Sequence, residues 1–287
     1  MDKTETLVAL VDGSVYAESV CDHAAWAAAR GGLQVELLHV LGRRAAGQAP
    51  ADLSGNMGVD DRNALLHELS VLDEQVAKLS QKRGRAILAD ARARLEAAGV
   101  SVVAPRLRFG DLLEAVAELE PHAAMIVIGK RGEAADFARL HLGSNLERVA
   151  RASRRPVFVA ARAFRPIRRF LIAYDGGASS MKAVDHVARD PVFEGLQCRL
   201  LCVGTDTPAT RRSLEDACAL LRAGGHEVTA DILPGQPDKA IAAAVEEEGI
   251  DLLVMGAYGH SRVRQLIIGS TTAEMIRLCK IPILLFR

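Results

Sequence analysis

The chain has 287 residues, enough for two ordinary domains, and 49% of them are apolar. Basic and acidic residues number 36 each, so the net charge gives no electrostatic basis for a nucleic-acid or membrane-surface partner. No signal-peptide pattern or membrane-length apolar run is present, so a soluble, cytoplasmic protein is expected. The five cysteines form no C-x-x-C pair and the histidines show no metal-ligand spacing, so free buried thiols and no metal site are expected.

The first half of the chain alternates short apolar runs with alanine-rich helical stretches. Its apolar runs lie in TLVALVDGS (6–14), VELLHV (35–40), AAMIVIGKRG (123–132) and GSNLERVARASRRPVFVA (143–160). Between the second and third runs is an insertion, placed at about 42–84, which starts rich in Gly, Ala, Pro and Asp and continues as a long helical pattern to about residue 98. Two interpretations stay open: a lid over the first domain's cleft, or an insertion that the fold tolerates.

The second half repeats this order. Its predicted strands are 169–174, 197–203, 227–232, 251–256 and 281–286, and its predicted helices are 178–189, 208–224, 237–248 and 270–279. Asp12 and Asp175 end the first strands of the two halves and lie 163 positions apart, as do Val40 and Val203 in the second strands. The equal spacing indicates an internal duplication.

The order of elements predicts the fold class. Near-continuously apolar strands separated by helices are typical of a parallel sheet with both faces covered. Each half is therefore expected to be a doubly wound, five-stranded α/β domain, with domain 1 at 1–162 and domain 2 at 168–287. The last strand of each half would expose a sheet edge, so we expect the two edges to pair about a pseudo-two-fold axis. A further homodimer is left open.

The stretch GAYGHSRVRQLIIGST (256–271) marks a candidate ligand site at the carboxyl edge of the second sheet, where open parallel sheets bind ligands. Gly256 and Gly259 permit a tight turn and a close approach to a ligand. Gly269 then precedes a helix whose free N–H groups and dipole favour an anion, and no acidic residue separates Gly256 from Gly269. An ordinary serine cap after a flexible loop explains one such copy equally well. The presence of the loop and a strand-end aspartate in both halves favours a nucleotide or similar phosphate ligand.

These motifs resemble the universal stress protein family in its two-domain form, over nearly the whole chain. The family pattern is G-x2-G-x9-G-[ST] after the fourth strand, with Asp-Gly at the end of the first strand. The second half matches at full spacing, whereas Gly129, Gly132 and Gly143 of the first half enclose a loop one residue longer. The resemblance implies an adenine nucleotide α-hydrolase-like fold, ATP bound as a ligand in one branch of the family, a role in stress resistance, and pairing through the last strand.

The resemblance also implies which residues of the second half contact ATP. Asp175 would face the adenosine, and Val203 would meet the base through its backbone. The loop 256–262 would surround the ribose and phosphates, and hydroxyls after it would hold phosphate oxygens. The whole implied set is Asp175, Val203, Gly256, Gly259, His260, Arg262, Gly269, Ser270, Thr271 and Thr272.

The matching set in the first half is Asp12, Val40, Gly129, Gly132, Gly143, Ser144 and Asn145. This half departs from the pattern, because Glu133 and Asp136 fall where phosphate would lie and Leu146 replaces the third hydroxyl. Each change weakens anion binding, although Lys130 and Arg131 offset part of the acidic charge. ATP is therefore expected mainly in the second half.

Several other functions are matched less well by the sequence. The Rossmann, Walker and G-x-S-x-G motifs are absent. A duplicated scaffold that has lost nucleotide and binds a partner or a small ligand remains an alternative, as does a slow ATPase. No general base is evident beside the loop, so hydrolysis is expected to be slow or absent. Asp175 could hold Mg²⁺ through water, or serve as a cap or a ribose contact.

Overall fold

The computed structural model describes residues 6–42, 59–102, 105–132, 144–257 and 269–287. The first half contributes the strands β1 (Thr6–Leu10), β2 (Gln34–Leu41), β3 (Arg106–Phe109), β4 (Ala123–Gly129) and β5 (Val157–Ala160). The second half contributes β6 (Arg169–Tyr174), β7 (Gln197–Val203), β8 (Val228–Leu233), β9 (Leu252–Gly256) and β10 (Ile283–Phe286). They form one sheet in the order β3-β2-β1-β4-β5-β10-β9-β6-β7-β8. Each half is parallel and repeats the same strand order, which confirms the predicted doubly wound α/β fold.

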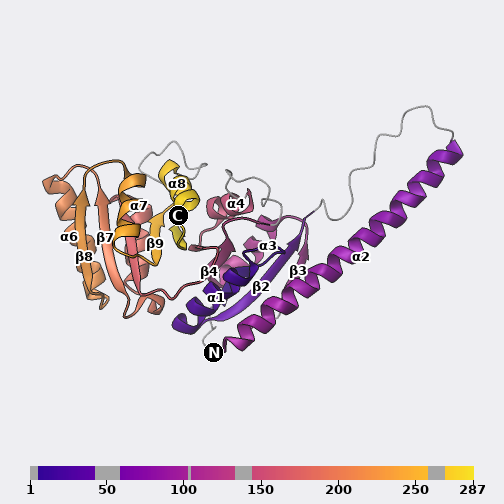
Figure 1. The fold of residues 1–287 in the computed structure, drawn as a ribbon, viewed down its shortest axis with the longest axis horizontal. Helices are drawn as coiled ribbons and strands as arrows, with labels where there is room; N and C mark the ends of the chain where they lie inside the picture. Colours follow the sequence, from indigo (N-terminus) through magenta and orange to yellow (C-terminus); the bar gives the residue numbers. More distant parts are fainter. Residues whose placement is uncertain (1–5, 43–58, 103–104, 133–143, 258–268) are drawn as a thin grey trace.

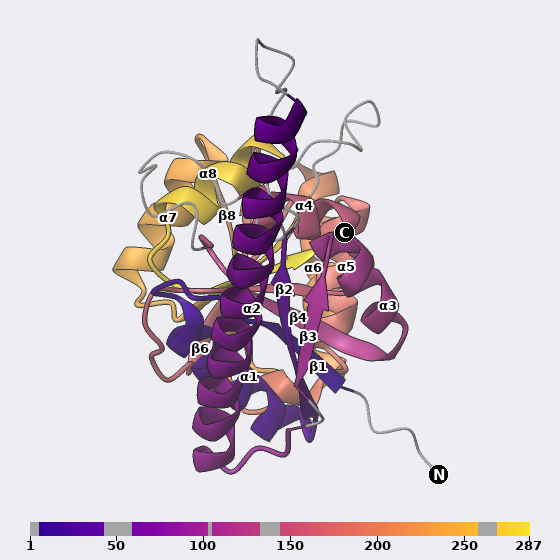
Figure 2. The ribbon, with the colours of Figure 1, turned by 90° about the vertical axis from the view of Figure 1, so that its right-hand side faces the viewer.

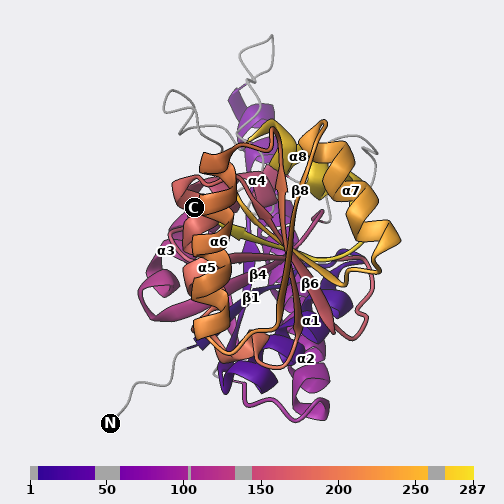
Figure 3. The same ribbon diagram turned by 90° about the vertical axis from the view of Figure 1, so that its left-hand side faces the viewer.

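Helices cover both faces of this sheet because successive residues of a buried strand point to opposite sides. Leu7 of β1 belongs to one core and Val8 to the other. The first core is covered by α1 (Ala17–Gly31), α2 (Val59–Ala97), α5 (Ala178–Val187) and α6 (Pro208–Ala223). The second is covered by α3 (Leu112–Leu119), α4 (Ser144–Ala152), α7 (Pro237–Glu247) and α8 (Ser270–Leu278). Figure 3 shows α5 and α6 on one side of the strands and α7 and α8 on the other.

The two halves join through their last strands. β5 and β10 pair antiparallel, with Phe158 opposite Leu284 and Val159 opposite Ile283. All four side chains are at most 1% exposed, and each of the two cores contains residues of both halves. A second link runs from α1 to the 3-10 helix Pro191–Phe193, where Arg30 Nε donates a hydrogen bond to Val192 O at 2.6 Å. The join is thus built from core residues as well as backbone hydrogen bonds.

Most of the insertion forms α2, which has 39 residues against 16 in α6. Its end at Ala97 agrees with the helical pattern predicted to about residue 98. The inner part of α2 packs on the domain through Leu88 and Leu95, and Arg94 forms a two-bond ion pair with Asp22. The outer part extends well beyond the sheet (Figures 1 and 2). Among the described residues, neither α2 nor any other helix is long and apolar enough to cross a membrane.

A lysine of the first half also reaches across the join. Lys130 follows β4 and donates from Nζ to the carbonyl oxygen of Cys279, just after α8. The sequence suggested that Lys130 offsets Glu133 and Asp136 of its own loop, two residues that lie outside the described part of the chain. In the structure the ammonium of Lys130 has a partner in the other half. Burial lowers the pKa of Lys130 to about 8, from an ordinary value near 10.5.

This shift predicts a pH dependence of stability. Because the folded pKa lies below the unfolded one, the native state releases a proton between pH 8 and 10.5 that the unfolded state keeps, so stability rises with pH in that window. The free energy of unfolding of wild type minus that of Lys130→Met should grow by about 1.5 kcal/mol from pH 8 to 9.5. Urea denaturation at both pH values measures it. Burial also raises the pKa values of thiols such as Cys21 and Cys198. Their contribution to the pH dependence is the same in both proteins, so it is removed when the two free energies of unfolding are subtracted. A constant difference would contradict the prediction.

Candidate functional site

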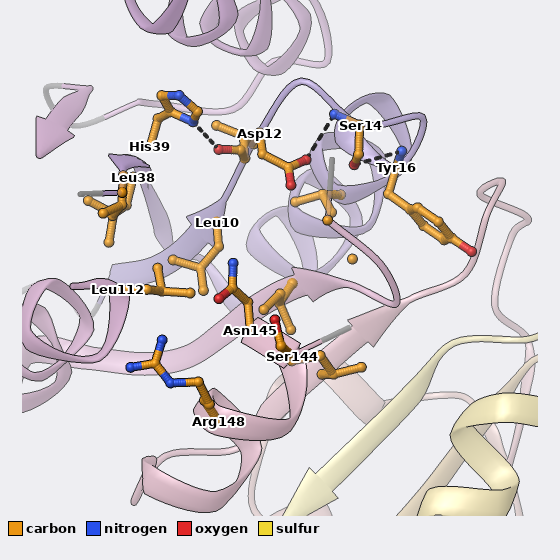
Figure 4. Close-up of a pocket in the computed structure, with 18 of the residues that line it drawn as sticks. Leu10, Asp12, Ser14, Tyr16, Leu38, His39, Leu112, Ser144, Asn145 and Arg148 are labelled. Atoms are coloured by element: carbon orange, nitrogen blue, oxygen red, sulfur yellow. Dashed lines mark hydrogen bonds between the residues drawn. The ribbon is translucent and has the colours of Figure 1, made fainter. Parts of the chain in front are cut away.

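A cleft of about 700 Å³ opens at the carboxyl edge of the first half, between the ends of β1, β2 and β4 and the first turn of α4 (Figure 4). Its lining includes six residues of the set predicted for this half: Asp12, Val40, Gly129, Gly132, Ser144 and Asn145. Gly143, the remaining member, lies outside the described residues. No residue of α2 is in the lining, so the described part of the insertion gives no support to the lid interpretation.

The strand-end aspartates of both halves close the same turn. Asp12 Oδ1 accepts a hydrogen bond from Ser14 N at 3.0 Å, and Asp175 Oδ1 accepts one from Gly177 N at 2.8 Å. Ser180 Oγ also donates to Asp175 Oδ1, at 2.6 Å. A side chain bonded to the backbone two residues later is an Asx turn, which fixes where the chain leaves the strand. Each carboxylate is thereby oriented at the sheet edge before any ligand binds.

The second half presents the start of α8 beside this aspartate. Strands β6 and β9 are neighbours, so Asp175, after β6, and the turn into α8, after β9, share one edge. Gly269 N donates to Ala257 O at 3.0 Å, which ties the helix start to the strand end. No side-chain cap closes α8 among the described residues, and Ser270 is exposed. The first N–H groups of a helix have no intrahelical partner, so this terminus suits an anion.

One residue predicted to bind phosphate has a different partner. Thr272 is 3% exposed and its Oγ1 donates to Gly256 O at 3.1 Å, so its hydroxyl holds α8 on β9. Leu146, its equivalent in α4, is buried in the core. The contrast between these two residues therefore concerns packing. Of the other two hydroxyl residues at this helix start, Ser270 is exposed and Thr271 is partly buried.

The other predicted residues of the second half fall into two groups. Val203 ends β7 and is partly buried against the second core. Gly259, His260 and Arg262 lie outside the described residues, as do Glu133 and Asp136 of the first half.

Packing explains why β4 and β9 end in glycine, and the sequence did not reveal this explanation. A Cβ on Gly256 would lie 2.8 Å from Ser179 Cβ in α5, and one on Gly129 would lie 2.7 Å from Tyr16 Cβ. Both glycines therefore let the helix after the first strand pack against the strand end. Gly132 differs, because a Cβ there would lie 3.0 Å from Asp12 Oδ2, at the carboxylate itself.

Gly256→Ala is expected to destabilise the protein by about 1–3 kcal/mol, because the new methyl group overlaps the first turn of α5 and backbone must shift. Thermal and urea unfolding measure the loss. Gly42→Ala is the matched control, since a Cβ at Gly42 meets no atom within 4 Å. Equal stability of Gly256→Ala and wild type would contradict this packing role.

The first cleft also contains a cation that sequence reasoning missed. Arg148 lines it one helical turn after Ser144, and its Nη2 donates to Asp111 Oδ2 at 2.5 Å. The adjacent guanidinium lowers the pKa of Asp111, which also caps α3 by accepting from Leu113 N at 2.8 Å. The i, i+4 spacing of Ser144 and Arg148 was the available signal, because it places both on one helix face. The described residues contain no cluster of three or more metal-ligating side chains.

Comparison with known proteins agrees with this architecture. The model of the universal stress protein family matches residues 3–161 and 204–287. A universal stress protein of Synechocystis sp. is 36% identical over 99% of this chain and 100% of its own length. The chain belongs to the universal stress protein family. A shorter relative of Methanocaldococcus jannaschii, another universal stress protein, is 27% identical over 28% of this chain and 50% of its own.

Solved structures show the same two-part fold. A universal stress protein from Archaeoglobus fulgidus superimposes with a TM-score of 0.68 at 23% identity, covering 99% of this chain and 96% of its own. A structure from Pseudomonas aeruginosa described as a putative universal stress protein gives 0.61 at 14% identity, covering 99% and 93%. In this universal stress protein the sheet edges at the ends of β1 and β4, and of β6 and β9, are therefore equivalent positions of one repeated fold.

Proposed function

We propose that this universal stress protein binds ATP as a ligand in the cytoplasm, mainly in its second half, and acts in stress resistance. The observation that carries the proposal is the start of α8, where an exposed serine and helix N–H groups without an intrahelical partner lie at the same sheet edge as the oriented carboxylate of Asp175. An anion is favoured there by the helix dipole and by hydrogen bonds from the N–H groups. The glycine-loop spacing between β9 and α8 supports a nucleotide as that anion.

The first-half cleft supports a second, weaker nucleotide site. It gathers six predicted residues around one cavity, and Arg131 and Arg148 add positive charge. Arg148 already forms an ion pair with Asp111, so part of its positive charge is neutralised within the protein. The alternatives are a scaffold that has lost nucleotide and a slow ATPase, in which Mg²⁺ would accompany ATP.

Calorimetric titration of the purified protein with ATP and Mg²⁺ tests the proposal. We expect about one nucleotide per chain to bind at modest ATP concentration and further binding only at high concentration. Nucleotide released on denaturing the purified protein should be adenine nucleotide. Absence of both signals would favour the scaffold alternative, and robust steady-state phosphate release that Ser270→Ala abolishes would favour an ATPase.

A further inference from the structure

The outer part of α2 carries a regular apolar stripe. Leu65, Leu69, Leu72, Val76 and Leu79 recur at alternating spacings of four and three residues, which is the heptad spacing of helices that pair along one seam. Leu72 is 55% exposed, Val76 47% and Leu79 66%. We call these five residues the α2 seam. An exposed, contiguous apolar stripe of this kind marks an interaction surface.

The α2 seam is separate from the face that packs on the protein's own sheet. The buried residues of the inner part are Gly84, Leu88, Ala91 and Leu95. At 3.6 residues per turn, they lie about 110° around the helix axis from the seam. Figure 1 shows that the seam-bearing part of α2 extends beyond the sheet. The ion pair of Arg94 with Asp22 and the buried leucines hold the inner part, so the seam is presented on a helix whose base is already fixed.

We propose that the α2 seam pairs with the α2 seam of a second copy of this chain, in antiparallel orientation. A heptad stripe is recognised by another helix with the same spacing, and two identical stripes satisfy each other about a two-fold axis. The charges beside the seam select the direction. Glu68, Gln75 and Lys82 flank one side at intervals of seven residues, and Asp73 flanks the other.

In the antiparallel pair the two-fold axis passes near Gln75, so Glu68 of each chain faces Lys82 of the other at both ends, and these two attractive contacts outweigh the one between the two Asp73 side chains near the axis. In a parallel pair Glu68 would face Asp73 of the other chain on both sides, which is repulsive. Glu68, Asp73 and Lys82 are all exposed. The antiparallel arrangement also places the two sheets at opposite ends of the helix pair, because each sheet lies at the C-terminal end of its own α2 (Figures 1 and 2).

Sedimentation velocity on the full chain tests the seam. Wild type should sediment as a dimer and Leu72→Asp as a monomer, because the charge lies at the centre of the seam. Ser70→Asp is the matched control: it adds the same charge at an exposed position on another face of α2 and should remain dimeric. Circular dichroism and ATP titration confirm that each variant is folded. A wild-type monomer at every concentration, or a dimeric Leu72→Asp, would overturn the proposal.

A charge exchange tests the orientation. Glu68→Lys places like charges together at both ends of the antiparallel pair, and the dimer should dissociate at roughly tenfold higher concentration. Lys82→Glu should do the same, whereas the double variant Glu68→Lys with Lys82→Glu should restore the wild-type value. These surface changes leave the core intact. Failure of the double variant to restore dimerisation would overturn the antiparallel arrangement.

Discussion

Ser270→Ala is expected to weaken ATP binding by at least about tenfold, while Ser144→Ala changes it little. Ser270 is exposed at the first residue of α8, where its hydroxyl and the first N–H groups of the helix, which have no intrahelical partner, can reach one phosphate. A charge-assisted hydrogen bond to phosphate contributes about 1–3 kcal/mol, and about 1.4 kcal/mol corresponds to a factor of ten in affinity. Titration calorimetry on both variants and wild type measures the two effects.

Ser144→Ala is the matched control because Ser144 occupies the equivalent position at the start of α4. Thr272→Val is a second control: its hydroxyl bonds Gly256 O, so removing it should lower the free energy of unfolding more than the affinity for ATP. If Ser144→Ala removes tight binding and Ser270→Ala does not, the first cleft, with Arg148, is the main site and the assignment of the halves is reversed.

Phe158→Ala is expected to lower the free energy of unfolding by about 3–5 kcal/mol, the usual cost of deleting a fully buried aromatic ring. Phe158 is 1% exposed in β5 and lies opposite Leu284 across the join. Its ring also packs near His23 and Trp26 of α1, with centroid distances of 5.5 and 6.2 Å. The resulting cavity would therefore lie where the two halves meet.

Urea denaturation followed by circular dichroism measures this loss. Phe109→Ala is the control, because Phe109 lies in the outer strand β3 and is 58% exposed, so its removal should cost less than about 0.5 kcal/mol. A similar small change for Phe158→Ala would show that the join contributes little to stability. Because each core runs through both halves, wild type should unfold in a single transition.

The strands were predictable because their apolar runs are short and sharply bounded. Predicted strands at 169–174 and 197–203 coincide with β6 and β7. The repeat in the sequence also predicted that both halves have the same fold and meet through their last strands, as in the observed sheet. The length of α2 was less accessible, because a polar helix that extends from the domain lacks one continuous buried face. Domain boundaries at 1–162 and 168–287 remain our proposal, since the sheet runs across the join.

The residues of the site were predictable in position more than in role. Local spacing located Asp12, Gly129 and Ser144, which share one cleft. The contact that requires Gly256 is with Ser179, 77 residues earlier, and no local pattern reports it. The partner of Thr272 is likewise a carbonyl across the loop. Contacts between residues far apart in the sequence decide such roles. Sequence spacing alone does not show these contacts, so it predicted that Gly256 and Thr272 contact the ligand.

The antiparallel join of β5 and β10 has a consequence for aggregation. An exposed apolar strand edge is a template on which other chains add strands, and the duplication moves the two apolar last strands to the middle of the sheet. The edges that remain, β3 and β8, carry charged residues that are paired: Arg106 with Glu36, Arg108 with Glu118, and Asp231 with Arg199. A foreign strand that added there would have to approach these charges. Because both last strands belong to one chain, their pairing does not depend on protein concentration, and the apolar edges stay covered even in dilute solution. Two separate domains would cover these edges only at concentrations at which they associate.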